Sequence, residues 1–289
     1  MSLRVRVRGL VCLACVLVAA CSSPVKPRPA PLSAALDANR RAEALLRAGD
    51  LEGAARGYRE ALRAAQALED ADAIAANAVN LSIVYQRLGK LEDARASLAP
   101  VLEQPNLSFP HDRLAQASLR RAIVDLDQHR LASAAEWAGR AESHCDGSCG
   151  VSAAIHNVRG QISLEGGDAG AASASARRAL EASRASGDRA EAANALRLLG
   201  VSTLRAGDPA AALAHVDQAL AIDRELAAPR KIWLDLVWLG RISALRGERE
   251  SALAYYERAL TVSEAENDAR GAAEVHGLMR GLAASATSR

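Results

Sequence analysis

Two cysteines four residues apart offer the most definite chemistry in this sequence. Cys145 and Cys149 flank a short Asp-Gly-Ser turn, and His144 stands beside them. Two thiols this close can pair in an oxidising compartment. A closed zinc site needs four ligands, and no second cysteine–histidine cluster exists to complete one. We therefore expect a structural disulfide, with two free thiols, or a metal or redox site, as the alternatives.

The other titratable residues show no catalytic spacing. The six histidines lie at positions 111, 129, 144, 156, 215 and 276, and no glycine-rich phosphate loop, nucleophile elbow or paired-histidine motif occurs. Acid pairs such as Glu69-Asp70 fall in predicted turns, where they would be solvated or cap helices. We expect neither an enzyme nor a bound cofactor or metal ion.

A third cysteine, Cys21, follows a segment typical of an export signal. Three arginines precede a short apolar run over residues 10–20, which is too short to span a bilayer because that takes about 20 apolar residues. The run ends in Val18-Ala19-Ala20-Cys21, which resembles the lipobox of bacterial lipoproteins. That resemblance implies cleavage before Cys21 and lipidation of its thiol. Ser22 at the next position implies the outer membrane of a Gram-negative cell, facing the periplasm. An ordinary cleaved signal peptide with a chance cysteine is the alternative.

The chain that remains after residue 20 is near neutral and poor in aromatic residues. It holds 33 Lys+Arg against 34 Asp+Glu, so it lacks the basic excess of a nucleic-acid-binding protein. Alanine dominates instead, and alanine is the best helix former and lets helices approach closely. The composition predicts an all-α protein. Four prolines within residues 21–34 predict an extended tether before it.

A repeat of about forty residues organises the rest of the chain. Gly49, Gly89, His129, Gly167, Gly207 and Gly247 are spaced by 40, 40, 38, 40 and 40 residues, and an alanine follows each after five residues, namely Ala54, Ala94, Ala134, Ala172, Ala212 and Ala252. A glycine suits the C-terminal cap of a helix, and Asp50, Asp168 and Asp208 can cap the helix that follows. One helix pair cannot bury its apolar face alone, so the units must stack into a solenoid.

The fifth and sixth units resemble the tetratricopeptide repeat. The fifth reads Leu199-Gly200, Gly207-Asp208, Ala212 and Ala219-Leu220, and the sixth repeats most of this pattern forty residues later. The family's usual period is 34 residues, so the step near 40 is similar to its longer-helix variant. The resemblance implies a right-handed α-solenoid over residues 35–285, with six helix-turn-helix repeats and a C-terminal capping helix. Signal peptide (1–20) and lipidated tether (21–34) precede it.

The third unit departs most from the pattern. His129 replaces the glycine, Asp125 stands where an apolar residue is usual, and Glu142 replaces a leucine. Pro105 and Pro110 also break the segment before it. We expect this unit to be bent or loosely packed.

In the tetratricopeptide repeat family the first helix of each unit lines the concave face. Mapping its groove positions onto this chain predicts partner-binding residues in units four to six, namely Asn157, Gln161, Asn194, Arg197 and Arg241. The same mapping selects Asn39, Glu43, Asn80, Gln86 and Arg120 in the earlier units. Amides and arginines in a groove can bind peptide backbone and carboxylates. For each residue the alternative is a solvated helix face. Trp233 and Trp238 are expected in the core more than in contact with a ligand.

These features predict a membrane-anchored, non-enzymatic scaffold that binds a protein or peptide partner in the cell envelope through its concave surface. The alternative is an assembly factor for an oligomeric envelope or secretion complex, like the repeat-bearing pilotin lipoproteins. The first hypothesis predicts a monomer with a peptide-sized ligand. The second predicts an oligomer or a ring-like partner.

Overall fold

The structure is a computed structural model that describes residues 30–103, 107–146 and 149–287. Cys21 and most of the predicted tether lie outside the described residues. The described residues form fourteen α-helices and no strand. The helices are α1 (Ala30–Arg47), α2 (Leu51–Ala67), α3 (Ala71–Arg87), α4 (Leu91–Ala96), α5 (Ala99–Leu102), α6 (His111–Asp127), α7 (Leu131–Cys145), α8 (Ser152–Glu165), α9 (Ala169–Ser186), α10 (Arg189–Arg205), α11 (Pro209–Glu225), α12 (Pro229–Leu245), α13 (Arg249–Ala265) and α14 (Ala269–Thr287).

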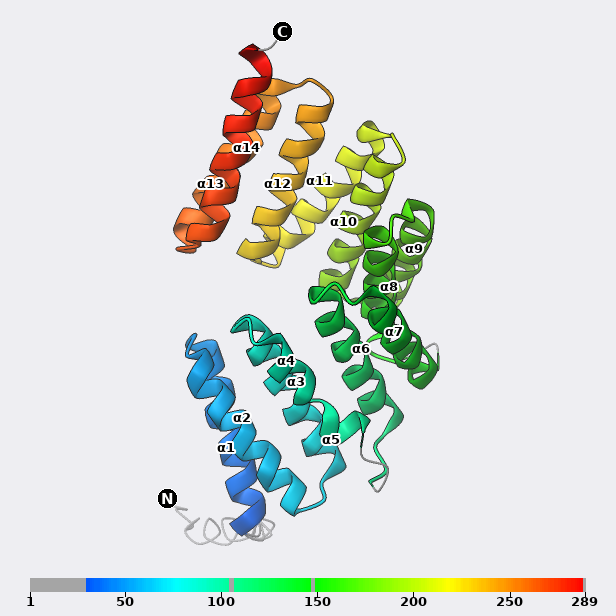
Figure 1. Cartoon of the computed structure of the whole chain (residues 1–289), viewed down its shortest axis with the longest axis vertical. Helices are drawn as coiled ribbons and strands as arrows, with labels where there is room; N and C mark the ends of the chain where they lie inside the picture. The colour runs from blue at the N-terminus through cyan, green and yellow to red at the C-terminus, as the bar shows by residue number, and fades with distance from the viewer. Residues whose placement is uncertain (1–29, 104–106, 147–148, 288–289) are drawn as a thin grey trace, which may run out of the picture.

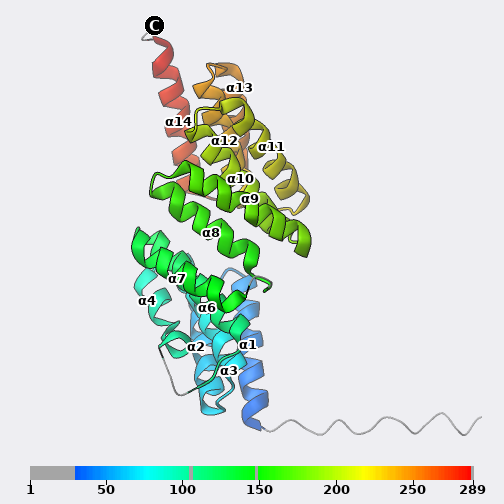
Figure 2. The same ribbon diagram turned by 90° about the vertical axis from the view of Figure 1, so that its right-hand side faces the viewer.

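Successive helices pair into six stacked units, as predicted. The pairs are α1 with α2, α3 with α4 and α5, α6 with α7, α8 with α9, α10 with α11, and α12 with α13, and α14 packs on α13 as the cap. The first helices also contact one another from unit two onward, in the order α3, α6, α8, α10 and α12. They therefore form the inner side of the arc in Figure 1, and Figure 2 shows the units stacked along the long axis. The predicted all-α solenoid with a C-terminal capping helix is confirmed.

The turn inside each unit has the conformation that the regularly spaced glycines favour. Gly49 and Gly207 have φ of 81° and 90°, in the left-handed region that glycine enters without strain. The aspartates that follow then cap the second helices. Oδ1 of Asp50 accepts a hydrogen bond from the Gly53 amide at 2.8 Å, and Asp208 does the same for Ala211 at 2.9 Å. Sequence and local structure therefore agree at the end of one helix and the start of the next.

Small residues set how closely the helices of a unit approach. The six alanines that stand five residues after the repeated glycine position are all fully buried. On the facing helices, a Cβ added at Gly200 would overlap the Val216 side chain, and one at Gly240 would overlap Tyr256. Because no space is left between the paired helices at these sites, a larger residue at any of them would overpack the unit.

The third unit is ordered, contrary to the expectation of loose packing. His129 adopts a left-handed φ of 56° in place of the missing glycine. Asp125 is fully buried but satisfied, because Arg121 Nε lies 3.2 Å from its Oδ2 and Ser133 Oγ donates to the same oxygen at 2.6 Å. A buried acid with these donors is compatible with tight packing. The departures in sequence therefore specify a polar core contact.

The irregular element lies one unit earlier. The second helix of unit two is broken into α4 and α5 at Ser97 and Leu98, and Pro100 stands in the first turn of α5. A proline is tolerated there but would break the interior of a longer helix. A proline also stands in the first turn of α1, which begins at Ala30 and continues with Pro31. The helical part thus starts earlier than residue 35.

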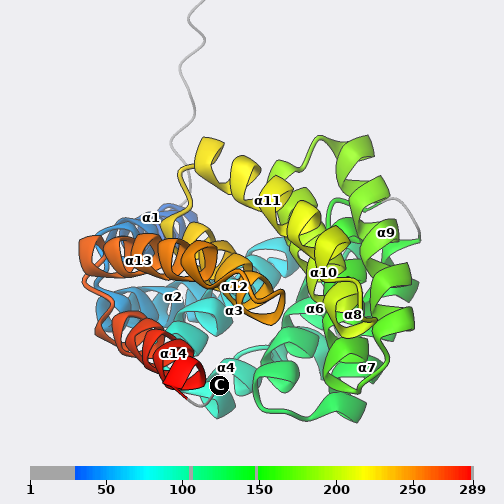
Figure 3. The same cartoon turned by 90° about the horizontal axis from the view of Figure 1, so that it is seen from above.

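The superhelix curls far enough that its two ends face each other. Residues of units one to three, of unit six and of the cap line one cavity of about 1080 Å³, with Arg87 and Asp127 on one side and Arg230 and Glu274 on the other. Figure 3 shows α12 to α14 above α1 to α3. Among the described helices, none has the length and apolar character needed to cross a membrane.

Candidate functional site

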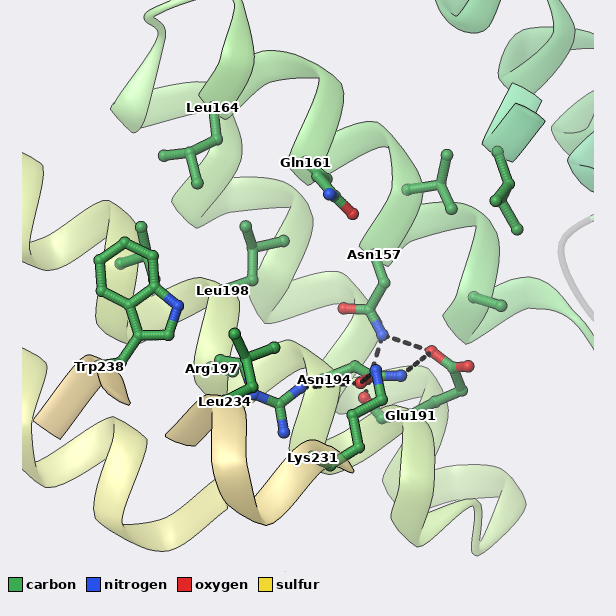
Figure 4. Close-up of a pocket in the computed structure, with 14 residues that line it drawn as sticks. Asn157, Gln161, Leu164, Glu191, Asn194, Arg197, Leu198, Lys231, Leu234 and Trp238 are labelled. Carbon is green, nitrogen blue, oxygen red and sulfur yellow. Dashed lines mark hydrogen bonds between the residues drawn. The ribbon is translucent and has the colours of Figure 1, made fainter. Parts of the chain in front are cut away.

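A cavity of about 460 Å³ opens between the first helices of units four to six, and we call it the concave cavity. Figure 4 shows its lining, which α8, α10 and α12 supply almost entirely. Polar side chains gather at one end, namely Asn157, Glu191, Asn194, Arg197 and Lys231. Apolar side chains form the rest, chiefly Val158, Leu164, Leu198, Val201, Leu234 and Trp238. A volume of this size lies in the range of ordinary ligand sites.

The forty-residue period builds this cavity. It places Asn157 and Arg197, Glu191 and Lys231, and Leu198 and Trp238 at equivalent positions of successive helices. Within α10, side chains three or four residues apart share one face. Glu191, Asn194, Leu198 and Val201 therefore all point into the same space. Each helix contributes a polar group near its N-terminal part and an apolar group further along.

A hydrogen-bonded network joins the three helices at the polar end. Glu191 Oε2 accepts from Asn157 Nδ2 at 2.7 Å and from Asn194 Nδ2 at 3.3 Å. Asn194 Oδ1 in turn accepts from Arg197 NH1 and from Lys231 Nζ, each at 2.9 Å. Burial, and then the neighbouring Arg197, lowers the pKa of Lys231. The network fixes the polar groups before any ligand arrives.

Arg197 is buried and fully committed to internal partners. Its Nε donates to Asp235 at 2.5 Å, and its NH2 group donates to Asp223. Both carboxylates are also buried. Burial raises the pKa of Asp235 to about 7, although Arg197 opposes the shift, and the charge of Asp223 adds to it. The prediction that Arg197 is free to bind a ligand carboxylate is wrong, because Asp223 and Asp235 already hold its guanidinium. Its burial also excludes the alternative of a solvated helix face.

Asn157 leaves one buried atom without a partner. Its Nδ2 also donates to the backbone oxygen of Glu191 at 3.0 Å, but its Oδ1 accepts no hydrogen bond within the described residues. The residue is only 9% exposed. In Figure 4 this oxygen points away from Glu191. Gln161 is the opposite case, since it is exposed at the rim of the same cavity.

Arg241 does not line the concave cavity, unlike the other four predicted residues. Its guanidinium lies 5.1 Å from the centre of the Trp238 ring and donates to Glu274 of α14 at 2.9 Å. Trp238 itself lines the cavity and also packs against two core clusters. Arg241 therefore contacts Trp238 of the cavity wall without lining the cavity itself. The sequence predicted this tryptophan mainly as a core residue.

Sequence reasoning missed two charged residues, Glu191 and Lys231, and most of the apolar wall. The signal that could have found them is the repeat itself. One period of 40 residues relates Glu191 to Lys231, and four residues of helix separate Asn157 from Gln161. Glu191 lies three residues before the predicted Asn194 on the same helix, so helix spacing followed by one period would have selected both charged residues.

The predicted cysteine pair lies in the turn between units three and four. The structure joins Cys145 and Cys149 in a disulfide, with their Cα atoms 4.9 Å apart. The ring of His144 lies 6.0 Å from that of His111. Burial, and then the neighbouring His111, lowers the pKa of His144. No group of three or more metal-ligating side chains occurs among the described residues.

Two of the six units match a known protein family. Residues 151–225 match the tetratricopeptide repeat. The matched segment begins just before α8 and ends with α11, so it covers units four and five and two of the three walls of the concave cavity. With the solenoid fold, this match supports a tetratricopeptide repeat protein. No curated protein sequence matches the chain significantly.

Solved structures share the fold at low sequence identity. BtubC (BKLC) from P. vanneervenii is 21% identical with a TM-score of 0.58, and the alignment covers 83% of this chain and 93% of that one. A Rap protein complexed with competence and sporulation factor is 16% identical, with a TM-score of 0.60 and coverages of 88% and 77%. PilF from Pseudomonas aeruginosa is 20% identical, with a TM-score of 0.51 and coverages of 73% and 92%. These similarities concern the fold alone.

Proposed function

We propose that this protein is a non-enzymatic scaffold that binds a peptide segment of an envelope protein in the concave cavity. One observation carries the proposal: the cavity presents a fixed polar network and an unpartnered buried acceptor, Asn157 Oδ1, beside an apolar wall. Buried polar groups are normally satisfied, so an unfilled acceptor in an open cavity suits a ligand that donates to it. The Rap protein of similar fold, crystallised with competence and sporulation factor, supports the use of such a solenoid for binding.

Site-specific crosslinking tests this proposal. A photoreactive residue at Gln161, on the rim of the cavity, is expected to form an adduct with one defined protein in intact cells. The matched control is Gln218, an exposed glutamine of the second helix α11 that does not line the cavity. Equal adducts from both positions, or adducts from Gln218 alone, would move the binding surface away from the cavity. An adduct with a further copy of the chain, in a stable oligomer, would favour the assembly-factor alternative.

The proposed location is the periplasmic face of an outer membrane, held by lipid on Cys21. The support is the sequence Val18-Ala19-Ala20-Cys21 after a cationic, apolar leader. Each buried methylene contributes about 0.8 kcal/mol to membrane binding, so several acyl chains on one residue would anchor the chain stably. The Cys21→Ser variant is expected to leave the membrane fraction. Retention of that variant after a high-salt wash would contradict the lipid anchor.

A further inference from the structure

The orientation of Asn157 defines which kind of atom a ligand must offer. Its Nδ2 faces two acceptors, the backbone oxygen of Glu191 at 3.0 Å and Glu191 Oε2 at 2.7 Å. An amide placed the other way round would set oxygen against oxygen, so this orientation is determined by its surroundings. No group of the described residues donates to the buried Oδ1, so this acceptor is available to a donor from a ligand. Leaving such an atom unpaired is costly, and a donor brought by a ligand removes the cost.

The charges at the polar end also favour a donor that is cationic. Three carboxylates, those of Glu191, Asp223 and Asp235, stand against two cations, Arg197 and Lys231. Both aspartates are used by Arg197, so Glu191 is the carboxylate that faces the cavity. Burial raises the pKa of Asp235 to about 7, and the charge of the neighbouring Asp223 adds to the shift. One positive charge on a ligand would balance the site.

Lys231 supplies a complementary donor next to these acceptors. Within the described residues its Nζ makes one side-chain hydrogen bond, to Asn194 Oδ1 at 2.9 Å. An ammonium group carries three donors, so two remain for a ligand oxygen. The polar end thus offers acceptors for an ammonium and a donor for a neighbouring carbonyl.

The apolar wall lies directly beside this polar end. Leu198 lies four residues after Asn194 on α10, Leu234 lies three residues after Lys231 on α12, and Trp238 closes the far side. Arg241 braces the Trp238 ring from behind at 5.1 Å. The wall is therefore suited to one apolar side chain attached close to the charged group.

We propose that the concave cavity recognises the amino terminus of a peptide whose first residue is apolar. The α-ammonium group donates to Asn157 Oδ1 and Glu191, the first carbonyl accepts from Lys231, and the first side chain packs against Leu198, Leu234 and Trp238. An internal peptide segment lacks the positive charge, and a free amino acid adds a carboxylate where acid is already in excess. This inference rests on the proposed function and specifies which part of a partner occupies the cavity.

A peptide library with one chemical variable tests the inference. The full-length protein is incubated with pentapeptide amides that vary in the first residue, each in a free-amine and an N-acetylated form, and retained peptides are identified by mass spectrometry. Free-amine peptides with an apolar first residue are expected to be retained, and acetylation is expected to weaken binding roughly tenfold, the difference between a charge-assisted and a neutral hydrogen bond.

Matched variants assign the preference to the cavity. Glu191→Gln keeps the shape of the side chain, removes its charge and is expected to abolish the preference for free amines. Glu181→Gln makes the same change in net charge on the exposed face of α9, outside the lining, and is expected to keep it. Ala154→Trp, which fills the cavity from α8, is expected to lose all retained peptides.

The outcomes separate the two proposals. Equal retention of free and acetylated peptides, lost in Ala154→Trp, would overturn amino-terminal recognition and leave the peptide-binding function standing. Retention unchanged in Ala154→Trp, or no retained peptide at all, would overturn both. If free leucine competes as well as Leu-Ala-Ala-Ala-Ala-amide does, the ligand is an amino acid, and the peptide amino terminus is the wrong source of the ammonium.

Discussion

Two buried arginines on the concave side are held in opposite ways. Arg120 of α6 reaches back to α3, where Nε donates to Ser82 Oγ at 3.2 Å and NH2 donates to Ser82 O at 3.4 Å and to Gln86. Arg197 of α10 reaches forward to two buried aspartates. Within the described residues, the direct partners of Arg120 are all neutral. Burial accordingly lowers the pKa of Arg120 to about 10, although nearby Asp127 opposes the shift.

The surroundings of Arg120 form a structural contact between helices, whereas those of Arg197 border a cavity. The neutral partners Ser82 and Gln86 join Arg120 of α6 to α3, and Arg120 itself lines neither the concave cavity nor the cavity between the two ends. Around Arg197, an excess of carboxylates and the Asn157–Glu191–Asn194 network leave a cavity with unused hydrogen-bonding capacity. The same repeat therefore produces a structural contact in its N-terminal half and a candidate binding site in its C-terminal half.

The largest expected effect comes from replacing each arginine with methionine. Arg197→Met leaves two buried aspartates without a cation and is expected to destabilise the fold by roughly 3–5 kcal/mol. Arg120→Met removes hydrogen bonds to neutral groups, each of which contributes about 1 kcal/mol, and leaves no buried carboxylate unpaired. Urea unfolding of both variants measures the difference. Equal losses would mean that the aspartates are not held by Arg197 as described.

Asp235 should also make the stability of the fold depend on pH. The raised pKa of Asp235, about 7, means that the folded state holds a proton that the unfolded chain has lost. This contribution to stability is complete below the ordinary pKa near 4 and is lost as the pH rises to about 7, at up to about 1.4 kcal/mol per pH unit.

Asp235→Asn mimics the protonated form and tests this contribution. The stability of the variant relative to the parent should increase between pH 5 and pH 8, because only the parent loses this contribution as the pH rises. The surrounding charged groups are Arg197 and Glu191 from α10, Asp223 from α11 and Lys231 from α12, and all remain in the variant. A stability gap that stays constant between pH 5 and pH 8 would show that Asp235 titrates normally.

The fold was predictable from sequence because its signals are local and repeated. The spacing from Gly49 to Gly247 identifies the turns, and the buried alanines identify the paired faces. Asn157, Gln161, Asn194 and Arg197 could be placed at one cavity for the same reason.

The roles of individual side chains were not predictable in this way. The commitment of Arg197 depends on Asp223 and Asp235, which come from two other helices. The position of Arg241 behind Trp238 depends on Glu274 of the capping helix. Such contacts join residues 26 to 38 positions apart, and a repeat pattern does not specify which of them form.

A smaller effect is expected from two matched arginine–tryptophan contacts. Arg140 lies 4.3 Å from the Trp137 ring in unit three, and Arg241 lies 5.1 Å from the Trp238 ring. Each Arg→Gln change is expected to cost about 0.5–1 kcal/mol. Only Arg241→Gln should also weaken ligand binding, because Trp238 lines the concave cavity and Trp137 does not. Equal effects of both variants on binding would mean that the ligand does not bind in the concave cavity.

The most direct test blocks one region and leaves the other open. Ala154 of α8 and Ala76 of α3 occupy the same position of the repeat, and both are partly exposed, but only Ala154 lines the concave cavity. Partner capture by chemical crosslinking in intact cells is measured for Ala154→Trp and Ala76→Trp at matched melting temperature and protein level. Capture is expected to be lost in Ala154→Trp and retained in Ala76→Trp. Retained capture in Ala154→Trp, or equal loss in both, would contradict binding in the concave cavity.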